Sequence, residues 1–294
     1  MGDVAFRSSG AVTFEIGGGR AGFAVCELRL EDGLVHEVFR DEQLISSDWS
    51  ADGRMMAYIA FTSDRKPRVA VFVRDAGGAP KKIHDLGIWR GNGGVDEDRE
   101  DRVSWSPDGR HLLVGTGHAG ARPAIRVMDR AGRLVTPMRF GTLARWVPVG
   151  SVIFRDHAQS PEEGRVWHVL DLENGAGPLG IEADTVRPAV SPDGRYVIVD
   201  DAGGEPRLFL FDLEIGTQEV LKRGYLDAIW LEPGLVSVIK AQPCERSPFP
   251  DPCAHSTAWH PVGSTRFTID ISSGRIASSA LRLSRDMDVL YSSG

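Results

Sequence analysis

The sequence lacks the features that would mark a membrane protein or a nucleic-acid-binding protein. No apolar run approaches the roughly 18 residues that a membrane-spanning helix needs. Basic residues are not in excess either, because 34 Lys and Arg stand against 41 Asp and Glu, for a net charge of −7. A protein that binds nucleic acid normally carries a basic surface. We therefore expect neither membrane insertion nor a nucleic-acid partner.

Signals for export and for several catalytic classes are missing as well. The first residues, MGDVAFR, lack the charged start and apolar centre of a secretory signal. The chain as written therefore predicts a cytoplasmic protein, and an exported protein whose signal has been removed would look the same. There is no Gly-x-Ser-x-Gly nucleophile elbow, no Gly-x-x-x-x-Gly-Lys phosphate loop and no His-Glu-x-x-His pair. We assign no catalytic residue and expect no cofactor.

Helix signals are almost absent from the chain. No window sustains apolar residues at helical spacing with capping residues at both ends. The 34 glycines and 17 prolines are scattered along the sequence, so they predict frequent turns and not a disordered tract. The predicted fold class is all-β.

A short turn motif recurs along the chain and predicts a repeat architecture. Three copies are clear, DWSADGR at 48–54, SWSPDGR at 104–110 and AVSPDGR at 189–195, and two are degenerate, RWVPVG at 145–150 and IWLEPG at 229–234. The anchor positions 49, 105, 146, 190 and 230 are 56, 41, 44 and 40 residues apart, which suits four short strands per repeat. In such a turn proline presets φ, aspartate accepts hydrogen bonds from nearby backbone and glycine takes a positive φ.

Each turn is followed by two apolar, partly alternating runs that predict strands. The first runs are 55–61, 111–114, 151–154, 196–199 and 235–239, and the second are 68–73, 124–128, 166–170, 207–211 and 266–271. Segments 11–16, 23–29 and 34–39 add three strands of a sixth repeat, whose fourth strand would be 287–291, or alternatively 4–8. We predict one domain over 1–294, a six-bladed β-propeller with four antiparallel strands per blade, closed by N- and C-terminal strands in one blade.

The turn blocks resemble a known repeat. WSPDGR at 105–110, followed by an apolar strand, a loop and the strand AIRVMD at 124–129, resembles the WD-like propeller repeat of the TolB family. Similar blades occur in the propeller domains of prolyl-oligopeptidase-type enzymes. The resemblance covers about 240 residues and implies the fold, but propellers host many unrelated activities. It does not imply peptidase activity here, because the nucleophile elbow is missing.

Connections at the two ends of the predicted strands differ in length. Turns such as 131–132, 174–175 and 273–274 are short, whereas the loops 63–67, 115–123, 156–164 and 200–206, the linker 87–102 and the segment 242–264 are longer and irregular. Because a rigid scaffold often carries its function on irregular loops, we expect the binding face at the longer ones. Segment 242–264 is predicted as a long inserted loop of the fifth repeat.

Segment 242–264 holds the most distinctive residues of the chain. Cys244 and Cys253 could close a disulfide around a proline-rich loop, or remain free thiols in an ordered loop. Together with His255 and His260 they also offer four ligands of the kind that zinc prefers. Their spacing matches no common zinc motif, so the disulfide, the free thiols and the metal site all stay open.

Four further residues fall in loops expected at the same face. His118 and His157 lie in equivalent loops of neighbouring repeats, and Arg65 and Glu205 lie in the corresponding loops of two others. Histidines that converge at the mouth of a propeller can bind a metal or act as acid and base. Because no third partner for the two histidines is obvious, we take all four residues as candidate binding residues and assign no metal.

The leading functional hypothesis is a non-catalytic scaffold. A regular propeller with one loop-rich face suits a protein or peptide partner, to which Phe249 and Trp259 could present aromatic rings. Equally, both rings could pack down to hold their loop in place. One alternative is a metal-assisted carbohydrate lyase or lactonase-type enzyme at the central channel, for which His118, His157 and an acidic residue would have to converge on one ion. The other is a structural subunit of a larger assembly.

Overall fold

In a computed structural model the chain folds into strands joined by turns and loops. The structure describes residues 5–7, 11–17, 23–41, 43–62, 66, 68–88, 102–117, 122–156, 166–182, 188–201, 206–243, 259–273 and 276–282. Within these ranges there are 23 strands and no helix, so the all-β prediction is confirmed. The chain forms two compact units, the first made of Met1–Pro161 with His168–Gly177 and the second of Glu162–Trp167 with Pro178–Gly294.

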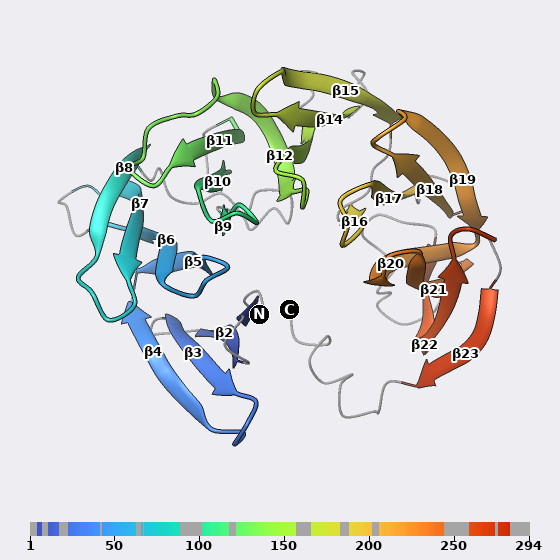
Figure 1. Cartoon of the computed structure of the whole chain (residues 1–294), viewed down its shortest axis with the longest axis horizontal. Helices are drawn as coiled ribbons and strands as arrows, with labels where there is room; N and C mark the ends of the chain where they lie inside the picture. Colours follow the sequence, from blue (N-terminus) through green and yellow to red (C-terminus); the bar gives the residue numbers. More distant parts are fainter. Residues whose placement is uncertain are drawn as a thin grey trace, which may run out of the picture. The chain divides into compact units, whose positions relative to one another are not determined.

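The first unit begins with two four-stranded antiparallel sheets (Figure 1). The first sheet consists of β1 (Ala5–Arg7), β2 (Ala11–Gly17), β3 (Phe23–Arg29) and β4 (Val35–Asp41) in that order. The second consists of β5 (Leu44–Trp49), β6 (Met55–Phe61), β7 (Arg68–Asp75) and β8 (Lys81–Ile88) in that order. Each strand pairs with its neighbour along the chain, so both sheets are simple meanders.

A seven-stranded sheet follows, in the order β15-β14-β13-β12-β11-β10-β9. Its strands are β9 (Arg102–Trp105), β10 (His111–Thr116), β11 (Ala124–Asp129), β12 (Arg139–Trp146), β13 (Val152–Asp156), β14 (Val166–Asp171) and β15 (Gly175–Glu182). β12 pairs with β11 only through Arg139 and Phe140, and then with β13 from Gly141 to Trp146. One strand therefore ends one group of strands and begins the next, and a register shift between Thr142 and Arg145 marks the change.

The second unit contains two more four-stranded antiparallel sheets. One consists of β16 (Ala189–Val190), β17 (Tyr196–Asp201), β18 (Arg207–Asp212) and β19 (Thr217–Arg223), and the other of β20 (Tyr225–Glu232), β21 (Leu235–Pro243), β22 (Trp259–Asp270) and β23 (Ile276–Arg282). Both are again meanders. The apolar runs predicted from the sequence coincide with the second and third strands of each group, with ends that differ by a few residues.

Apolar side chains on facing sheets form the core of the first unit. Met56 and Tyr58 of β6 pack in one cluster with Val25 of β3, whereas Ile59 of β6 packs in another cluster with Trp105 of β9. Successive side chains of a strand point to opposite faces of its sheet. β6 is thus buried on both faces, which explains why residues 55–61 read as an almost continuous apolar run.

Two tryptophans of the turn motif each link a group of strands to the group before it. In the second unit the indole Nε1 of Trp230 donates to the carbonyl of Ala189 over 3.0 Å, and its ring stacks on Tyr196 with centroids 6.2 Å apart. In the first unit the indole of Trp146 donates to the carbonyl of Ser104 over 3.2 Å. Trp146 and Trp230 are therefore packing residues, and each also supplies a hydrogen bond to the preceding group of strands.

The three clear turn motifs share one hydrogen-bond network built around a buried serine. Ser191 Oγ donates to the Asp193 carboxylate over 2.5 Å and accepts the backbone N–H of Tyr196 over 2.8 Å. Ser50 and Ser106 make the same two bonds in their own turns. The glycine of each turn has a positive φ, as predicted. The motif therefore recurs because its serine and aspartate side chains and its glycine cooperate in one closed turn.

Two expectations about the strands change with the structure. β1 supplies the fourth strand of the N-terminal sheet, which agrees with the alternative prediction of a strand at 4–8. The other predicted fourth strand, 287–291, lies outside the described residues. At the other end of the chain, β21 runs to Pro243 and β22 begins at Trp259. Both margins of the predicted loop 242–264 are therefore strand. The antiparallel pairing of β21 with β22 continues beyond the apolar runs 235–239 and 266–271 from which the two strands were predicted.

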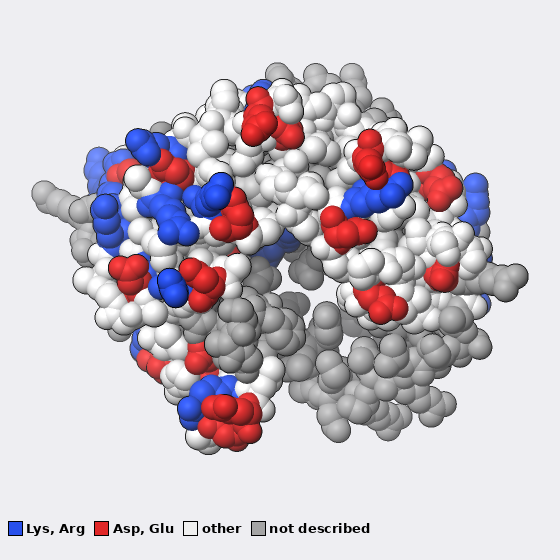
Figure 2. All heavy atoms as spheres, viewed as in Figure 1, with Lys and Arg blue, Asp and Glu red and all other residues white. Residues whose placement is uncertain are grey.

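A charged pair on the second sheet gives a pH-dependent prediction. Over β5–β8, at the left of Figure 2, basic and acidic side chains are interspersed. Arg68 holds both oxygens of Asp85 in hydrogen bonds of 2.9 to 3.1 Å, and with a smaller contribution from Lys82 it lowers the pKa of Asp85 from 3.8 to about 2. The folded state thus favours the carboxylate, so this stabilisation is present above about pH 4 and is lost as the pH falls through about 2.

We expect Asp85→Asn to lower the free energy of unfolding at pH 7 by at most about 1 kcal/mol, because a third of the side chain is exposed to solvent. The difference from wild type should shrink as the pH approaches 2, and urea unfolding at the two pH values measures it. A deficit that stayed constant with pH would contradict this assignment.

Candidate functional site

Each group of four strands that contains a motif turn has a turn end and a loop end. The turn end carries the motif turns, such as those between β5 and β6 or between β9 and β10, and the loop end is the opposite one, where β6 connects to β7 and β10 to β11. In the first unit the turn ends of these two groups lie together, because the backbone N–H of Trp105 donates to the Asp48 carboxylate over 2.7 Å and a Cβ on Gly109 would lie 3.9 Å from that of Ser50. These motif turns therefore share one end of the first unit, as predicted, whereas the long loops lie mostly outside the described residues and their placement stays a prediction.

Most of the predicted binding residues lie outside the described part of the chain. They are Arg65, His118, His157, Glu205, Cys244, Phe249, Cys253 and His255. The predictions of a disulfide, of free thiols, of a zinc site and of converging histidines are therefore untested and stay predictions.

Two of the predicted residues have a described backbone. Trp259 and His260 are the first residues of β22, where they lie opposite Pro243 and Gln242 of β21. They belong to a strand pair at the base of the segment and not to an irregular loop. The third cysteine, Cys26, is buried, and burial raises the pKa of its thiol.

The described residues contain neither a metal-binding group nor a membrane-crossing helix. Within the ranges given above, no three His, Cys, Asp or Glu side chains come together where they could hold a metal ion. The same part of the chain has no helix with the length and apolarity needed to cross a membrane.

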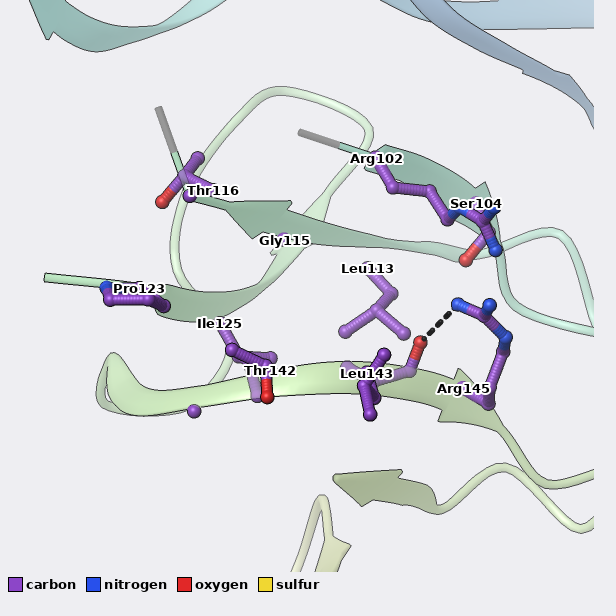
Figure 3. A pocket seen from close by; sticks show the side chains of 13 residues that line it. Arg102, Ser104, Leu113, Gly115, Thr116, Pro123, Ile125, Thr142, Leu143 and Arg145 are labelled. Carbon is purple, nitrogen blue, oxygen red and sulfur yellow. Dashed lines mark hydrogen bonds between the residues drawn. The ribbon is translucent and has the colours of Figure 1, made fainter. Parts of the chain in front are cut away.

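A small pocket lies at the loop end of the first unit, where β12 crosses from β11 to β13 (Figure 3). We call it the β12 pocket. Its cavity volume is about 30 Å³, and it is lined by Arg102, Ser104, Leu113, Gly115, Thr116, Gly117, Pro123, Ile125, Gly141, Thr142, Leu143, Ala144 and Arg145. These residues come from the start of β9, the end of β10, the start of β11 and the bend of β12. The pocket thus exists because one strand changes partners here.

The bend of β12 is conformationally unusual. Leu143 has a φ of 56°, the only positive value among the described residues other than glycine. A leucine in the left-handed region costs about 1–2 kcal/mol, so the neighbouring pairing must hold it there. Gly141 permits the crossing, because its N–H donates to the carbonyl of Pro123 while it pairs with Asp156 of β13.

Two guanidinium groups stand at one side of this pocket. Figure 3 shows Arg102 on β9 and Arg145 on β12 reaching toward the same side, where Ser104 also lies. Arg145 Nη1 donates to the carbonyl of Ala144 over 3.1 Å, which holds its side chain close to the bend. Across the pocket, the Thr116 hydroxyl donates to the carbonyl of Ala124 over 3.3 Å. The site combines positive charge and hydroxyls with an apolar wall.

Sequence reasoning did not single out these residues. Arg102 reads as the end of a mostly acidic linker, and Arg145 reads as the first residue of a degenerate turn motif. The spacing of the anchors does not reveal the pocket either, because anchors 190 and 230 are 40 residues apart and belong to two separate sheets, whereas anchors 105 and 146 are 41 apart and share β12.

Comparisons with known proteins support the fold and leave the family open. No family model matches the chain, and no curated protein sequence matches it. Among solved structures, the chain is similar to the β-propeller domain of the trilobed protease from Pyrococcus furiosus, with a TM-score of 0.56 and 16% identity over 94% of this chain and 84% of that one. It is also similar to TolB from Acinetobacter baumannii, with a TM-score of 0.52 and 17% identity over 91% and 63% of the two chains.

A third similar structure is an enzyme, oligogalacturonate lyase in complex with manganese. Its TM-score is 0.56 and its identity 16%, over 73% of this chain and 62% of that one. The chain thus spans less than two thirds of the length of TolB and of the lyase. At these identities the likeness concerns fold alone, and the described sheets have the antiparallel, helix-free organisation of a TolB-like β-propeller.

Proposed function

We propose that the chain is a non-catalytic binding protein that holds a protein or peptide partner at its loop end. The observation that carries this proposal is the asymmetry between the two ends of each sheet. The turn end is closed by repeated Ser–Asp networks with buried serines. The loop end carries the long connections, and in the first unit it also holds the β12 pocket. Recognition surfaces are commonly built this way, with variable loops on a rigid scaffold.

We also propose that the sheets are the blades of a six-bladed ring. Four of them have four strands, and the seven-stranded sheet can be divided into two groups of four that share β12. Because the N-terminal sheet has four strands from the first 41 residues, such a ring would not need a strand from the C-terminus. The trilobed protease domain, which has an open velcro topology, offers a precedent for this arrangement.

The binding proposal can be tested by shortening the segment that follows β21. Pro243 and Trp259 lie opposite each other in the β21–β22 pair, so a two-residue Asn-Gly turn can replace residues 244–258 without disturbing the strands. The deletion removes the candidate residues Cys244, Phe249 and Cys253. When the two proteins are cross-linked in cells of the native source, we expect the shortened protein to lose partners that the wild-type protein retains. The control carries Arg110→Ser and Arg133→Ser at the turn end, where both side chains are highly exposed. An unchanged partner set in the shortened protein would remove this surface from the proposal.

A metal-assisted carbohydrate lyase is the second candidate, and the likeness to a manganese-bound oligogalacturonate lyase favours it over other enzymes. It would require His118, His157 and an acidic residue to meet around one ion. Elemental analysis of the purified protein, followed by assay of oligogalacturonate cleavage with added manganese, tests it. Cleavage that depends on both manganese and His157 would replace the binding proposal.

A further inference from the structure

The β12 pocket differs in charge from the chain as a whole. The protein carries a net charge of −7, yet the described residues that line this pocket include two arginines and no Asp or Glu. Arg102 and Arg145 reach toward the same side of it (Figure 3). A site whose described lining carries positive side chains and no negative ones favours an anionic ligand.

The size of the pocket limits what that anion can be. A cavity of about 30 Å³ holds about two water molecules. Pockets for nucleotides or sugars are about ten times larger or more. A planar group of three heavy atoms is of suitable size, and a carboxylate is the common biological anion of that kind.

The chemistry of the lining also favours a carboxylate. The planar fork of an arginine guanidinium matches the two oxygens of a carboxylate, and the Ser104 hydroxyl on the same side can add a donor. Leu113, Ile125 and Leu143 provide an apolar wall for the carbon chain that carries the carboxylate. Inorganic phosphate has no such carbon chain, and it would meet the apolar wall with charged oxygens.

From size, charge and lining together, we propose that the β12 pocket binds the carboxylate of a bound peptide, either the C-terminal group or an Asp or Glu side chain. This inference rests on the proposed function in one respect, namely that the molecule bearing the carboxylate is a peptide. Arg102 from β9 and Arg145 from β12 supply the charge, and the bend at Leu143 sets where the second of these stands.

Trp146 provides a reporter for this site. It follows Arg145 in the chain, and its indole N–H donates to the carbonyl of the lining residue Ser104. In full-length protein labelled with ¹⁵N at tryptophan, the Trp146 indole resonance can be followed while peptides are added. The probes are N-acetyl-Gly-Gly-Leu with a free carboxylate, the same peptide as its amide, N-acetyl-Gly-Glu-Leu amide, and inorganic phosphate.

We expect at least one carboxylate peptide to shift the Trp146 resonance with saturation, and to bind about tenfold more tightly than the neutral amide. The free-acid and Glu-containing peptides distinguish a C-terminal group from a side chain. Equal binding of acid and amide peptides to the wild-type protein, or no shift with any peptide, would overturn the proposal. Tighter binding of phosphate than of either carboxylate would also overturn it, and none of these results depends on a variant that has to fold.

Variants then assign the two arginines. Arg102→Gln and Arg145→Gln should each remove the preference for the carboxylate, while Arg145→Lys should retain part of it. Arg133→Gln is the matched control, because this exposed arginine pairs with Asp129 in a turn away from the pocket lining. If both glutamine variants still bound the carboxylate peptide more tightly than the amide peptide, the role assigned to the two arginines would be refuted. A pocket that binds carboxylates in a protein with no partner at its loop end would leave this inference standing and contradict only the proposed function.

Discussion

Replacing Gly132 with alanine should destabilise the first unit by about 3 kcal/mol or more, the largest loss expected from a single methyl group in the described chain. Gly132 ends the turn after β11, and a Cβ added to it would stand 2.1 Å from the carbonyl oxygen of Ile83 in β8. The obstacle is backbone, so no side chain can rotate away. The His84 ring nitrogen Nδ1 also meets the Gly132 carbonyl at 3.1 Å. The substitution would therefore force apart two sheets that touch here.

Gly77→Ala separates the steric cost from the cost of backbone strain. Gly77 lies in the corresponding turn after β7 with a φ of 80°, close to the 83° of Gly132, but a Cβ on it would meet nothing within 4 Å. We expect this control to lose only about 1 kcal/mol, from strain in the left-handed region. Urea unfolding of both variants gives the comparison. If Gly132→Ala were no less stable than Gly77→Ala, the close approach of the two sheets would be wrong.

Much of the strand arrangement could be predicted from the sequence because its signals are local. Ser106, Asp108 and Gly109 lie within four positions of one another, and their bonds close a turn without help from distant residues. The apolar runs that follow are equally local, since a strand such as β6 that is buried on both faces has few positions for polar residues. The serine hydroxyl is the part of the motif that pattern reading missed, because its buried contact with the next strand appears only in three dimensions.

The parts that could not be predicted depend on pairing between distant segments. Strand β1 is three residues long, and nothing in it distinguishes the N-terminal from the C-terminal segment as the partner of β2. Arg102 and Arg145 are 43 positions apart and line one pocket only because β12 changes partners between them. The loop residues favoured from sequence, including His118 and His157, lie outside the described residues, so the candidate site rests on a different pair of side chains.

The crossing of β12 leads to the second large effect, which we expect for Gly141→Ala. An added Cβ would lie 2.6 Å from the carbonyl oxygen of Arg155 and 2.8 Å from Cδ2 of the Phe154 ring. Phe154 is buried in the core cluster with Leu113 and Ile125, so it has little room to retreat. We expect a loss of about 2–3 kcal/mol in the free energy of unfolding.

Gly177→Ala is the control for that loss, because Gly177 also lies in a strand, β15, but a Cβ there would meet nothing within 4 Å. Its stability should change by no more than about 0.5 kcal/mol. In a folded Gly141→Ala protein the displaced β12 should also move the Trp146 indole resonance, because Gly141 and Arg145 line the same pocket. A variant as stable as the control, with that resonance unmoved, would mean that β12 does not pass as closely over β13 as the pairing of Gly141 with Asp156 requires. The pocket would then lose the bend on which its shape depends.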